Sequence, residues 1–305
     1  MNGCRLEPSY DTFIPAFSKA STVNYFCTWR AQNDLAGTTN KIDAFGLSGH
    51  AKSALVLTEE NFLGRNGLLN KIYPNIRKDL YVVYDVGWDV PLDVNKDMDN
   101  WKSWLGSLIV AEDKFPSCTG TPVEKLFKLD SMTKALGWKG AGLWVHAQQA
   151  LHFYNSERVS NREYFIERLK WVNEAGIKYW KVDYGAHCAD LDFREMLSEL
   201  AEIYAPELII EHARNGAPLN DYYAPYDKAQ TFQTGRFCDW DSGKILDISL
   251  KTDVFRTYDV SYSLNIPTTL DRVAGLLSNT KNSKEYAAIL NCESEPVIGA
   301  GLGCA

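Results

Sequence analysis

The sequence predicts an α/β protein built as a (β/α)8 TIM barrel, because short apolar runs alternate with longer helical patterns along its 305 residues. No series of hairpin turns separates the runs, and no Gly-x-Gly-x-x-Gly motif follows one, which argues against a doubly wound nucleotide-binding sheet. The predicted strands are Thr22–Trp29, Leu80–Gly87, Ala141–Ala147, Tyr179–Gly185, Glu207–Ala213, Val254–Val260 and Ala287–Glu293.

Amphipathic patterns between these runs predict helices. The segment Arg162–Ala175 places Phe165, Leu169 and Val172 on one face, and Gly176 follows it, as is typical of a helix C-terminus. The other predicted helices are Thr121–Leu136, Asp190–Tyr204 and Thr268–Leu277.

We expect a single barrel domain over residues 1–305, with an N-terminal extension at 1–21 and loop insertions at 88–120 and 214–253. Long insertions after barrel strands usually lie at the active-site face, although an irregular surface loop is equally compatible with the pattern. The chain ends soon after the seventh predicted strand, whereas a closed barrel needs an eighth. Of a strand missed near residues 229–233 and a truncation near strand 7 or 8, we favour truncation.

Composition and charge exclude several classes of function. The net charge is −7 and no concentrated basic stretch occurs, so we expect no nucleic-acid partner. The seven cysteines form no Cys-x-x-Cys pair and the five histidines no His-Glu-x-x-His pattern, so we expect no metal and no cofactor. No signal peptide and no apolar stretch of about 18 residues is visible, so we expect a soluble chain, cytoplasmic unless its N-terminus was trimmed. The oligomeric state stays open.

Acidic residues fall at the ends of four predicted strands. In a parallel barrel, Asp85, Asp183, Glu211 and Asp259 would all lie at the C-terminal mouth, where barrel active sites sit. One such acid could cap a helix or face solvent, but four on the same rim are harder to explain in that way. Two carboxylates in one cleft are what glycoside hydrolysis requires, so the sequence predicts glycosidase chemistry.

Asp183 is the predicted nucleophile. Strand alternation places Lys181 and Asp183 on the same face, and a neighbouring cation favours the ionised carboxylate that nucleophilic attack needs. A structural Lys–Asp pair inside the barrel is the competing interpretation. Asp259, three residues after Arg256, is the predicted acid that protonates the leaving oxygen.

These elements resemble glycoside hydrolase clan D, families 27 and 36, whose founding activity is α-galactosidase. The resemblance runs in order from about residue 22 to 305. Its most specific elements are an Asp-x-x-Trp motif after the second strand and a Lys-x-Asp motif on the fourth. The matching segments are Tyr84–Asp89 (YDVGWD), Lys114–Pro116 (KFP), Gly142–Trp144 (GLW), Gly176–Asp183 (GIKYWKVD) and Phe255–Val260 (FRTYDV).

By this resemblance the chain hydrolyses a terminal α-linked sugar, most directly an α-galactoside, with retention and without a cofactor. Asp183 and Asp259 would be catalytic, and the partner would be an oligosaccharide or glycoside. Trp29 and Trp144 would form an aromatic wall, and Glu211 lies where a fifth-strand specificity residue falls. The substrate-binding residues implied are Asp85, Trp29, Trp88, Trp144, Lys181, Glu211 and Arg256.

Three departures from the family pattern leave alternatives open. Val86 replaces the second acid of an Asp-Asp pair, the Arg256-to-Asp259 spacing is one residue short, and the eighth strand and the usual C-terminal β-sandwich are absent. Another clan D specificity (α-N-acetylgalactosaminidase, β-L-arabinopyranosidase or isomalto-dextran hydrolase) is therefore one alternative, and a non-catalytic carbohydrate-binding barrel is another. An isomerase or aldolase that uses Lys181 as a Schiff base is less favoured, because a lysine beside an acid is poorly suited to being neutral.

Overall fold

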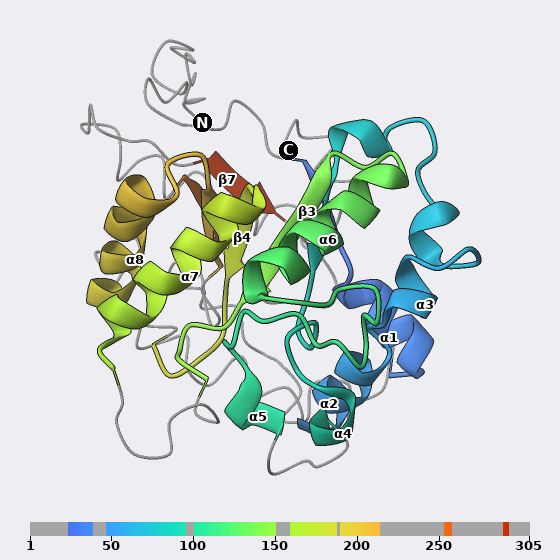
Figure 1. Cartoon of the computed structure of the whole chain (residues 1–305), viewed down its shortest axis with the longest axis horizontal. Coiled ribbons are helices and arrows are strands. Elements are labelled where there is room, and N and C mark those ends of the chain that lie inside the picture. Colours follow the sequence, from blue (N-terminus) through green and yellow to red (C-terminus); the bar gives the residue numbers. More distant parts are fainter. Residues whose placement is uncertain are drawn as a thin grey trace, which may run out of the picture.

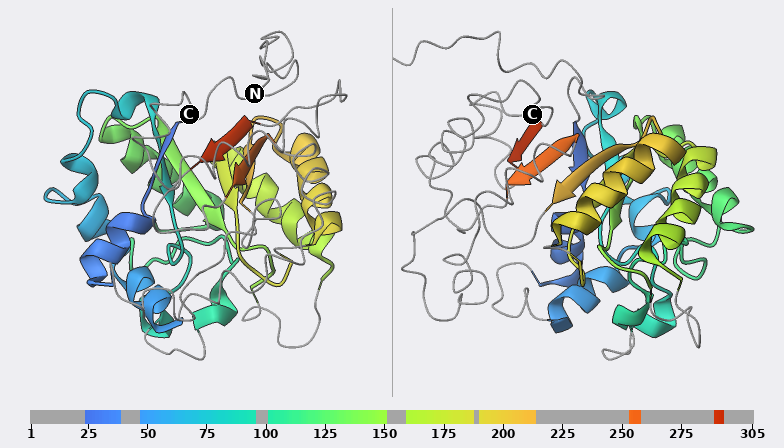
Figure 2. Two further views of the ribbon diagram at one scale, coloured as in Figure 1. Left: turned by 180° about the vertical axis from the view of Figure 1, so that it is seen from behind. Right: turned by 90° about the vertical axis from the view of Figure 1, so that its left-hand side faces the viewer.

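The strands form one parallel sheet in the order β1-β2-β3-β4-β5-β6-β7 (Figures 1 and 2). The computed structural model describes residues 24–38, 47–95, 101–150, 159–187, 190–213, 253–257 and 289–292. Within these ranges β1 and β7 are the sheet edges, and the sequential parallel order is compatible with part of a TIM-like barrel. The strands are β1 Tyr25–Cys27, β2 Tyr81–Tyr84, β3 Gly140–Val145, β4 Tyr179–Val182, β5 Ile209–Ala213, β6 Val254–Thr257 and β7 Ile289–Cys292.

All seven predicted strands are confirmed, and β1 to β5 are each shorter than their apolar runs. In β2, β3 and β4 the excess residues lie mostly at the C-terminal ends, where the chain leaves the sheet to form loops. The first strand illustrates the reason, because Trp29 already begins helix α1 (Trp29–Ala36). Thr28 still donates its backbone N–H to the carbonyl of Val83 at 3.0 Å, which ties this turn to β2.

Three long helices cover one side of the sheet, namely α6 (Pro122–Ala135), α7 (Asn161–Ala175) and α8 (Leu191–Tyr204) (Figure 1). Each begins at a residue whose side-chain oxygen accepts a backbone N–H of the first turn. Helices α6 and α7 have complete capping boxes, and Gly176 ends α7 with a φ of 78°, as predicted. The predicted helix Thr268–Leu277 lies outside the described residues.

Strand alternation separates two cores. Val82, Tyr84, Trp180 and Val182 point outward into the main core, where they pack against the helices. The intervening residues form a smaller inner cluster of Tyr81, Val83 and Tyr179, with Tyr25 and Ile209 against it. Because Asp85, Lys181 and Asp183 continue the inner series, the candidate site lies on the inner face of the sheet, above this cluster.

The predicted insertion at 88–120 is folded rather than irregular over its described part. It contains helices α4 (Leu92–Asn95) and α5 (Trp101–Trp104), which lie with α2 (Leu47–Leu55) at the bottom of the view in Figure 1. Buried Lys114 donates Nζ hydrogen bonds of 2.9 Å to the carbonyls of Ala54 and Gly87, and its burial lowers its pKa to about 8. The remaining short helices are α3 Glu59–Phe62, η3 Leu68–Asn70 and η4 Arg77–Asp79.

Other predicted features lie largely outside the described residues. These are the extension 1–21, the possible strand near 229–233 and all of the insertion 214–253 except Asp253. The carboxylate of Asp253 accepts the backbone N–H of Ile210 at 3.0 Å. Among the described helices, none is long and apolar enough to cross a membrane.

Gly87 joins β2 to this region at a position that requires glycine. Its φ is +105°, and a Cβ atom there would lie 2.5 Å from the Cβ of Ala54. Gly87→Ala should therefore lower the free energy of unfolding by about 2–4 kcal/mol, from backbone strain plus overpacking. Gly37→Ala is the matched control, because Gly37 also has a positive φ (+65°) but nothing lies within 4 Å of its Cβ position. Urea unfolding should show the larger loss for Gly87→Ala, and equal losses would contradict the steric argument.

Candidate functional site

A buried ion pair joins two predicted site residues across the inner face. Lys181 on β4 places its Nζ 2.9 Å from Oδ2 of Asp85, the first residue after β2. The thiol of Cys27 on β1 donates to the same oxygen at 3.1 Å, and the N–H of Val86 donates to Oδ1 at 2.8 Å. Together these contacts fix the Asp85 carboxylate in one orientation.

The surroundings of Asp85 keep it ionised. Burial by itself raises the pKa of this carboxyl, but the charge of Lys181 and the hydrogen bonds from Val86, Lys181 and Cys27 outweigh burial, so the pKa lies below its usual value. Strand alternation predicts Lys181 beside Asp183, whereas this ion pair connects Lys181 to Asp85. Lys181 thus pairs with a carboxylate at the end of another strand, β2.

Asp183, the predicted nucleophile, is the first residue after β4 and is 9% exposed. The indole Nε1–H of Trp144 donates to Asp183 Oδ2 at 3.1 Å, and the Asp183 N–H donates to the carbonyl of Val145 at 2.9 Å. Among the described residues, Oδ1 of Asp183 has no hydrogen-bond partner. One oxygen is therefore anchored to the aromatic wall while the other is open to a ligand.

The predicted aromatic wall is partly assembled. Trp29, at the start of α1, packs in the same small cluster as Trp144 and Val86. Val86 thus completes an apolar surface beside the two tryptophans.

Two residues predicted to contact the substrate, Trp88 and Glu211, are more deeply buried than the residues at the mouth. The ring of Trp88 lies in the main core, and its Nε1–H donates to the backbone carbonyl of Trp144 at 2.9 Å. Glu211 lies within β5 rather than at its end, paired in register with Lys181. Its carboxylate is fully buried and accepts the hydroxyl of Tyr179 at 2.6 Å and that of Tyr25 at 3.2 Å. The structure therefore places Trp88 behind the wall and Glu211 within the sheet, level with Lys181.

The sixth strand supplies the remaining predicted residues. Arg256 pairs in register with Ala213 on β5 and with Asn291 on β7, which places its backbone in the same row as Asp183. Asp259, the predicted acid, lies outside the described residues.

Arg194 is a buried residue of the site that the sequence analysis missed. From α8 its guanidinium donates to the carbonyl of Val182 at 2.7 Å and to that of Asp183 at 3.1 Å. It also donates to Nδ1 of His212 at 3.2 Å. Arg194 therefore fixes the backbone that carries Asp183, and burial followed by its charge lowers the pKa of His212 well below the usual range.

His146 was also missed, although alternation from Trp144 places it on the inner face. Its ring lies 5.4 Å from that of Trp144 and 5.5 Å from that of Tyr184, centroid to centroid. Neither ring nitrogen has a hydrogen-bond partner within the described part of the chain. Burial lowers the pKa of His146 to about 3, so the imidazole is neutral at physiological pH.

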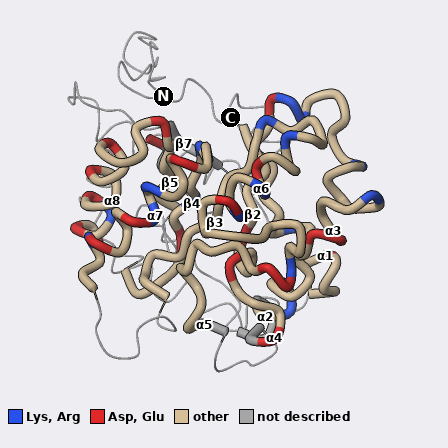
Figure 3. The backbone as a smooth tube through the Cα atoms, in the orientation of Figure 1, with Lys and Arg blue, Asp and Glu red and all other residues tan. Residues whose placement is uncertain are grey.

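Charged residues of both signs occur throughout the described ranges (Figure 3). No group of three or more His, Cys, Asp or Glu side chains there could hold a metal ion. Lys and Arg are interspersed with Asp and Glu along the tube in Figure 3. No model of a known protein family matches the chain, and no curated protein matches it. The motifs and this geometry therefore carry the functional argument.

The two buried neutral histidines predict a loss of stability on acidification. Their pKa values are depressed in the folded state, so both histidines stabilise the fold fully above pH 6.5, and His146 loses that contribution as the pH falls toward its pKa of about 3. His146→Gln removes one such group. We expect urea unfolding to show that the free energy of unfolding of His146→Gln, minus that of the unsubstituted protein, increases by about 2 kcal/mol from pH 7 to pH 5. An unchanged difference across this interval would show that folding does not depress the pKa of His146.

Proposed function

We propose that this chain is the catalytic barrel of a retaining glycoside hydrolase that acts on terminal α-linked sugars, with α-galactosides as the first candidates. One observation carries the proposal. At the C-terminal ends of parallel strands, Asp183 has one oxygen bound by Trp144 and one open, beside the buried Lys181–Asp85 pair. Barrel active sites are built at this end of the sheet. The sequential strand order further supports a complete (β/α)8 barrel.

In the proposed reaction, Oδ1 of Asp183 attacks the anomeric carbon while Asp259 gives its proton to the leaving oxygen. Water, deprotonated by Asp259, then cleaves the glycosyl–Asp183 ester and regenerates both acids. Retention requires that the two carboxyl groups lie about 5–5.5 Å apart, against about 6.5–9.5 Å for inversion. The indole N–H of Trp144 occupies Oδ2 of Asp183 and so directs attack to the open oxygen.

The Lys181–Asp85 pair suits recognition of sugar hydroxyls. An ammonium group offers three donors and a carboxylate offers acceptors, so a charged pair can bind two neighbouring hydroxyls with opposite polarity. Because both side chains are already buried and oriented, they lose little further entropy when a sugar binds. The same pair argues against Schiff-base chemistry, which needs a neutral lysine.

A non-catalytic carbohydrate-binding barrel is the second candidate, and Val86 is the observation that favours it. The apolar side chain packs beside Trp29 and Trp144 where the clan has a second acid. One polar sugar contact is therefore replaced by apolar surface. The other clan D specificities are alternatives for the same reason, and a panel of nitrophenyl glycosides would separate them.

Replacing the nucleophile tests the proposal directly. Asp183→Asn should lower kcat on nitrophenyl α-galactoside by about 10³-fold or more, because the amide cannot form the glycosyl ester. Asp34→Asn, an exposed aspartate on α1, is the control and should retain activity. Azide added to Asp183→Gly should restore turnover and yield a glycosyl azide. Full activity of Asp183→Asn would exclude the assignment, and galactose binding without turnover by the unsubstituted protein would favour the binding barrel.

Trp144→Phe isolates the hydrogen bond to Asp183, because phenylalanine retains an aromatic ring but lacks the donor. Loss of a donor to a charged group should lower kcat/KM by about 10–100-fold. Trp138→Phe is the matched control, because the indole N–H of Trp138 donates a buried hydrogen bond of 3.0 Å to the carbonyl of Leu69. Steady-state kinetics should show the loss only for Trp144→Phe; equal losses would indicate a general effect of indole removal.

A further inference from the structure

The mouth contains a thiol that the proposed reaction does not use. Cys27 is the last residue of β1, and strand alternation places it on the inner face, two residues after Tyr25. Its side chain is half-buried, in contrast to that of Cys118, which is fully buried. A small reagent that enters the mouth can therefore reach the Sγ atom of Cys27.

Cys27 forms a cluster with the buried ion pair. Its thiol donates to Oδ2 of Asp85 at 3.1 Å, and its Sγ accepts from Nζ of Lys181 at 3.7 Å. The same Nζ and Oδ2 lie 2.9 Å apart. The carboxylate is a ready acceptor for the thiol proton, and the ammonium stabilises the negative charge that deprotonation leaves on sulfur. These are the two neighbours that activate a nucleophilic thiol.

Asp183 provides a separate indication that the mouth admits a small polar molecule. Its side chain is 9% exposed and lies two residues beyond Lys181 on the inner face. Its Oδ1 has no hydrogen-bond partner among the described residues, and this oxygen retains accessible surface. A nearly buried carboxylate oxygen without a partner in the chain implies a partner from outside it, such as water, a sugar or a peroxide.

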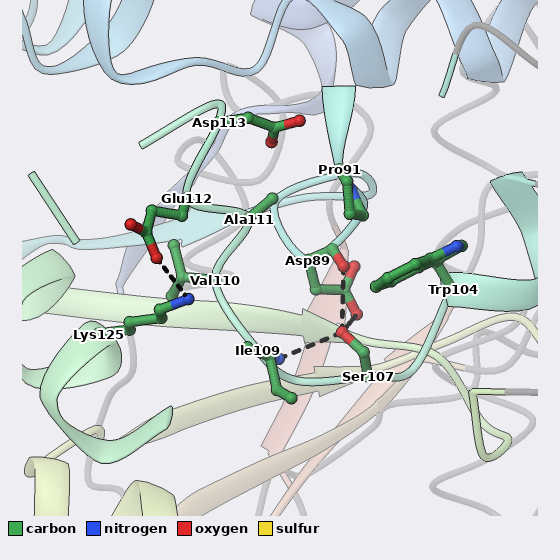
Figure 4. Close-up of a pocket in the computed structure, with 10 residues that line it drawn as sticks. All are labelled: Asp89, Pro91, Trp104, Ser107, Ile109, Val110, Ala111, Glu112, Asp113 and Lys125. Carbon is green, nitrogen blue, oxygen red and sulfur yellow. Dashed lines mark hydrogen bonds and ion pairs between the residues drawn. The ribbon is translucent and has the colours of Figure 1, made fainter. Parts of the chain in front are cut away.

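The pocket of the folded insertion offers no route to this thiol. Figure 4 shows a separate hollow of about 310 Å³, lined by residues of the segment 89–113 and by Lys125 on α6. None of Cys27, Asp85 and Lys181 lines it. The thiol is therefore approached through the mouth.

We propose that Cys27 is a peroxide-reactive thiol whose oxidation to sulfenic acid reversibly blocks the sugar site. The modification follows from the cluster, whereas its effect on sugar binding rests on the proposed function. The Sγ atom attacks one oxygen of hydrogen peroxide and breaks the O–O bond, while the thiol proton passes to Asp85 and then to the departing hydroxide. One thiol and one peroxide thus give one sulfenic acid and one water, with sulfur oxidised by two electrons and the peroxide reduced by two.

The added oxygen does not fit the cluster as it stands. Sγ of Cys27 and Oδ2 of Asp85 are already at hydrogen-bond distance, so the new oxygen displaces the carboxylate or points into the mouth. It also offers Lys181 a second acceptor in competition with Asp85. Either change alters the ion pair that recognises sugar hydroxyls. A thiol reductant restores the cluster, because formation of sulfenic acid is a reversible step of cysteine oxidation.

The modification is tested on the full chain by trapping sulfenic acid with dimedone after a stoichiometric dose of hydrogen peroxide. Peptide mass spectrometry should show that Cys27 is labelled at least about threefold faster in the folded protein than in the urea-unfolded chain, where no neighbour activates it. Cys118 is the internal control, because burial raises the pKa of its thiol to about 12, and folding should slow its labelling. A rate for Cys27 that folding does not increase would overturn the modification.

A double variant, Asp85→Asn with Lys181→Met, tests the activating pair. It removes both charges together, so neither is left unpaired in the interior. Cys27 should then be labelled about threefold more slowly than in the unsubstituted protein. An unchanged rate would show that exposure alone makes the thiol reactive. If the double variant does not fold, the comparison of folded and unfolded rates decides.

The effect on the sugar site is measured by calorimetry with D-galactose before and after peroxide. Peroxide should weaken binding by at least about tenfold and dithiothreitol should restore it. Cys27→Ser should bind galactose equally before and after treatment, whereas Cys118→Ser, the matched control, should respond like the unsubstituted protein. Unchanged binding after full labelling of Cys27, or an equal loss in Cys27→Ser, would overturn the regulation.

The outcomes separate this proposal from the glycosidase. Fast labelling of Cys27 in a protein that neither binds nor hydrolyses sugars would support the modification and count against the glycosidase. Hydrolysis by a protein whose Cys27 reacts no faster than in the unfolded chain would overturn the modification alone.

Discussion

The buried ion pair between Lys181 and Asp85 is the constraint on which the candidate site depends. An uncompensated charge in a protein interior costs several kcal/mol, so neither group could remain ionised without the other. The pair spans β2 and β4, with β3 between them, and Cys27 joins it from β1. Four neighbouring strands must therefore keep their relative registers for the charges to meet. A hydrophobic pair of similar volume would stabilise the sheet at least as well, which makes recognition a better reason for this arrangement than stability.

The inner face becomes more polar from its floor to its mouth. The lowest layer is aromatic, with the rings of Tyr81 and Tyr179 stacked at a centroid distance of 6.1 Å. Glu211 lies just above with its carboxylate bound by two tyrosine hydroxyls, and the Lys181–Asp85 pair is level with it. Asp183 is the next inner residue along its strand. The packed floor excludes water from below, so the charges above it act in a medium of low polarity where they are strong.

Apolar periodicity and capping residues were sufficient to predict the regular elements. The seven strands and the helices α6, α7 and α8 lie where the patterns placed them, because burial of one face and satisfaction of the first turn are local requirements. Alternation also predicted the common face of Lys181 and Asp183. Alternation could not place Trp88, which follows Gly87 and its positive φ, because the two-residue period ends where the strand ends. The same two-residue period predicts that Glu211 faces inward, but it does not predict how deeply the carboxylate is buried.

Arg194 could not be found from local pattern at all. Along α8 an arginine reads as a solvent-facing residue, yet this one is buried beneath the ends of β4 and β5. Its position follows from a requirement of the sheet, since carbonyls at strand ends have no partner on the next strand and need donors from elsewhere. Tertiary packing decides which side chain supplies these donors. Long-range satisfaction of backbone groups is therefore the information that the sequence pattern lacks.

The bonding of buried carboxylates distinguishes structural acids from those available to a ligand. Asp130 uses both oxygens, one on the N–H of Ala141 at 2.9 Å and one on Lys134 at 2.6 Å. Asp183 and Asp89 each use only one among their described neighbours. A fold selected for stability alone would satisfy these oxygens or replace the acids, because an unused buried acceptor lowers stability and contributes nothing in return. Trp144, which binds one oxygen of Asp183, belongs to a cluster against which Trp104 of the insertion also packs, and this contact connects the insertion to the mouth.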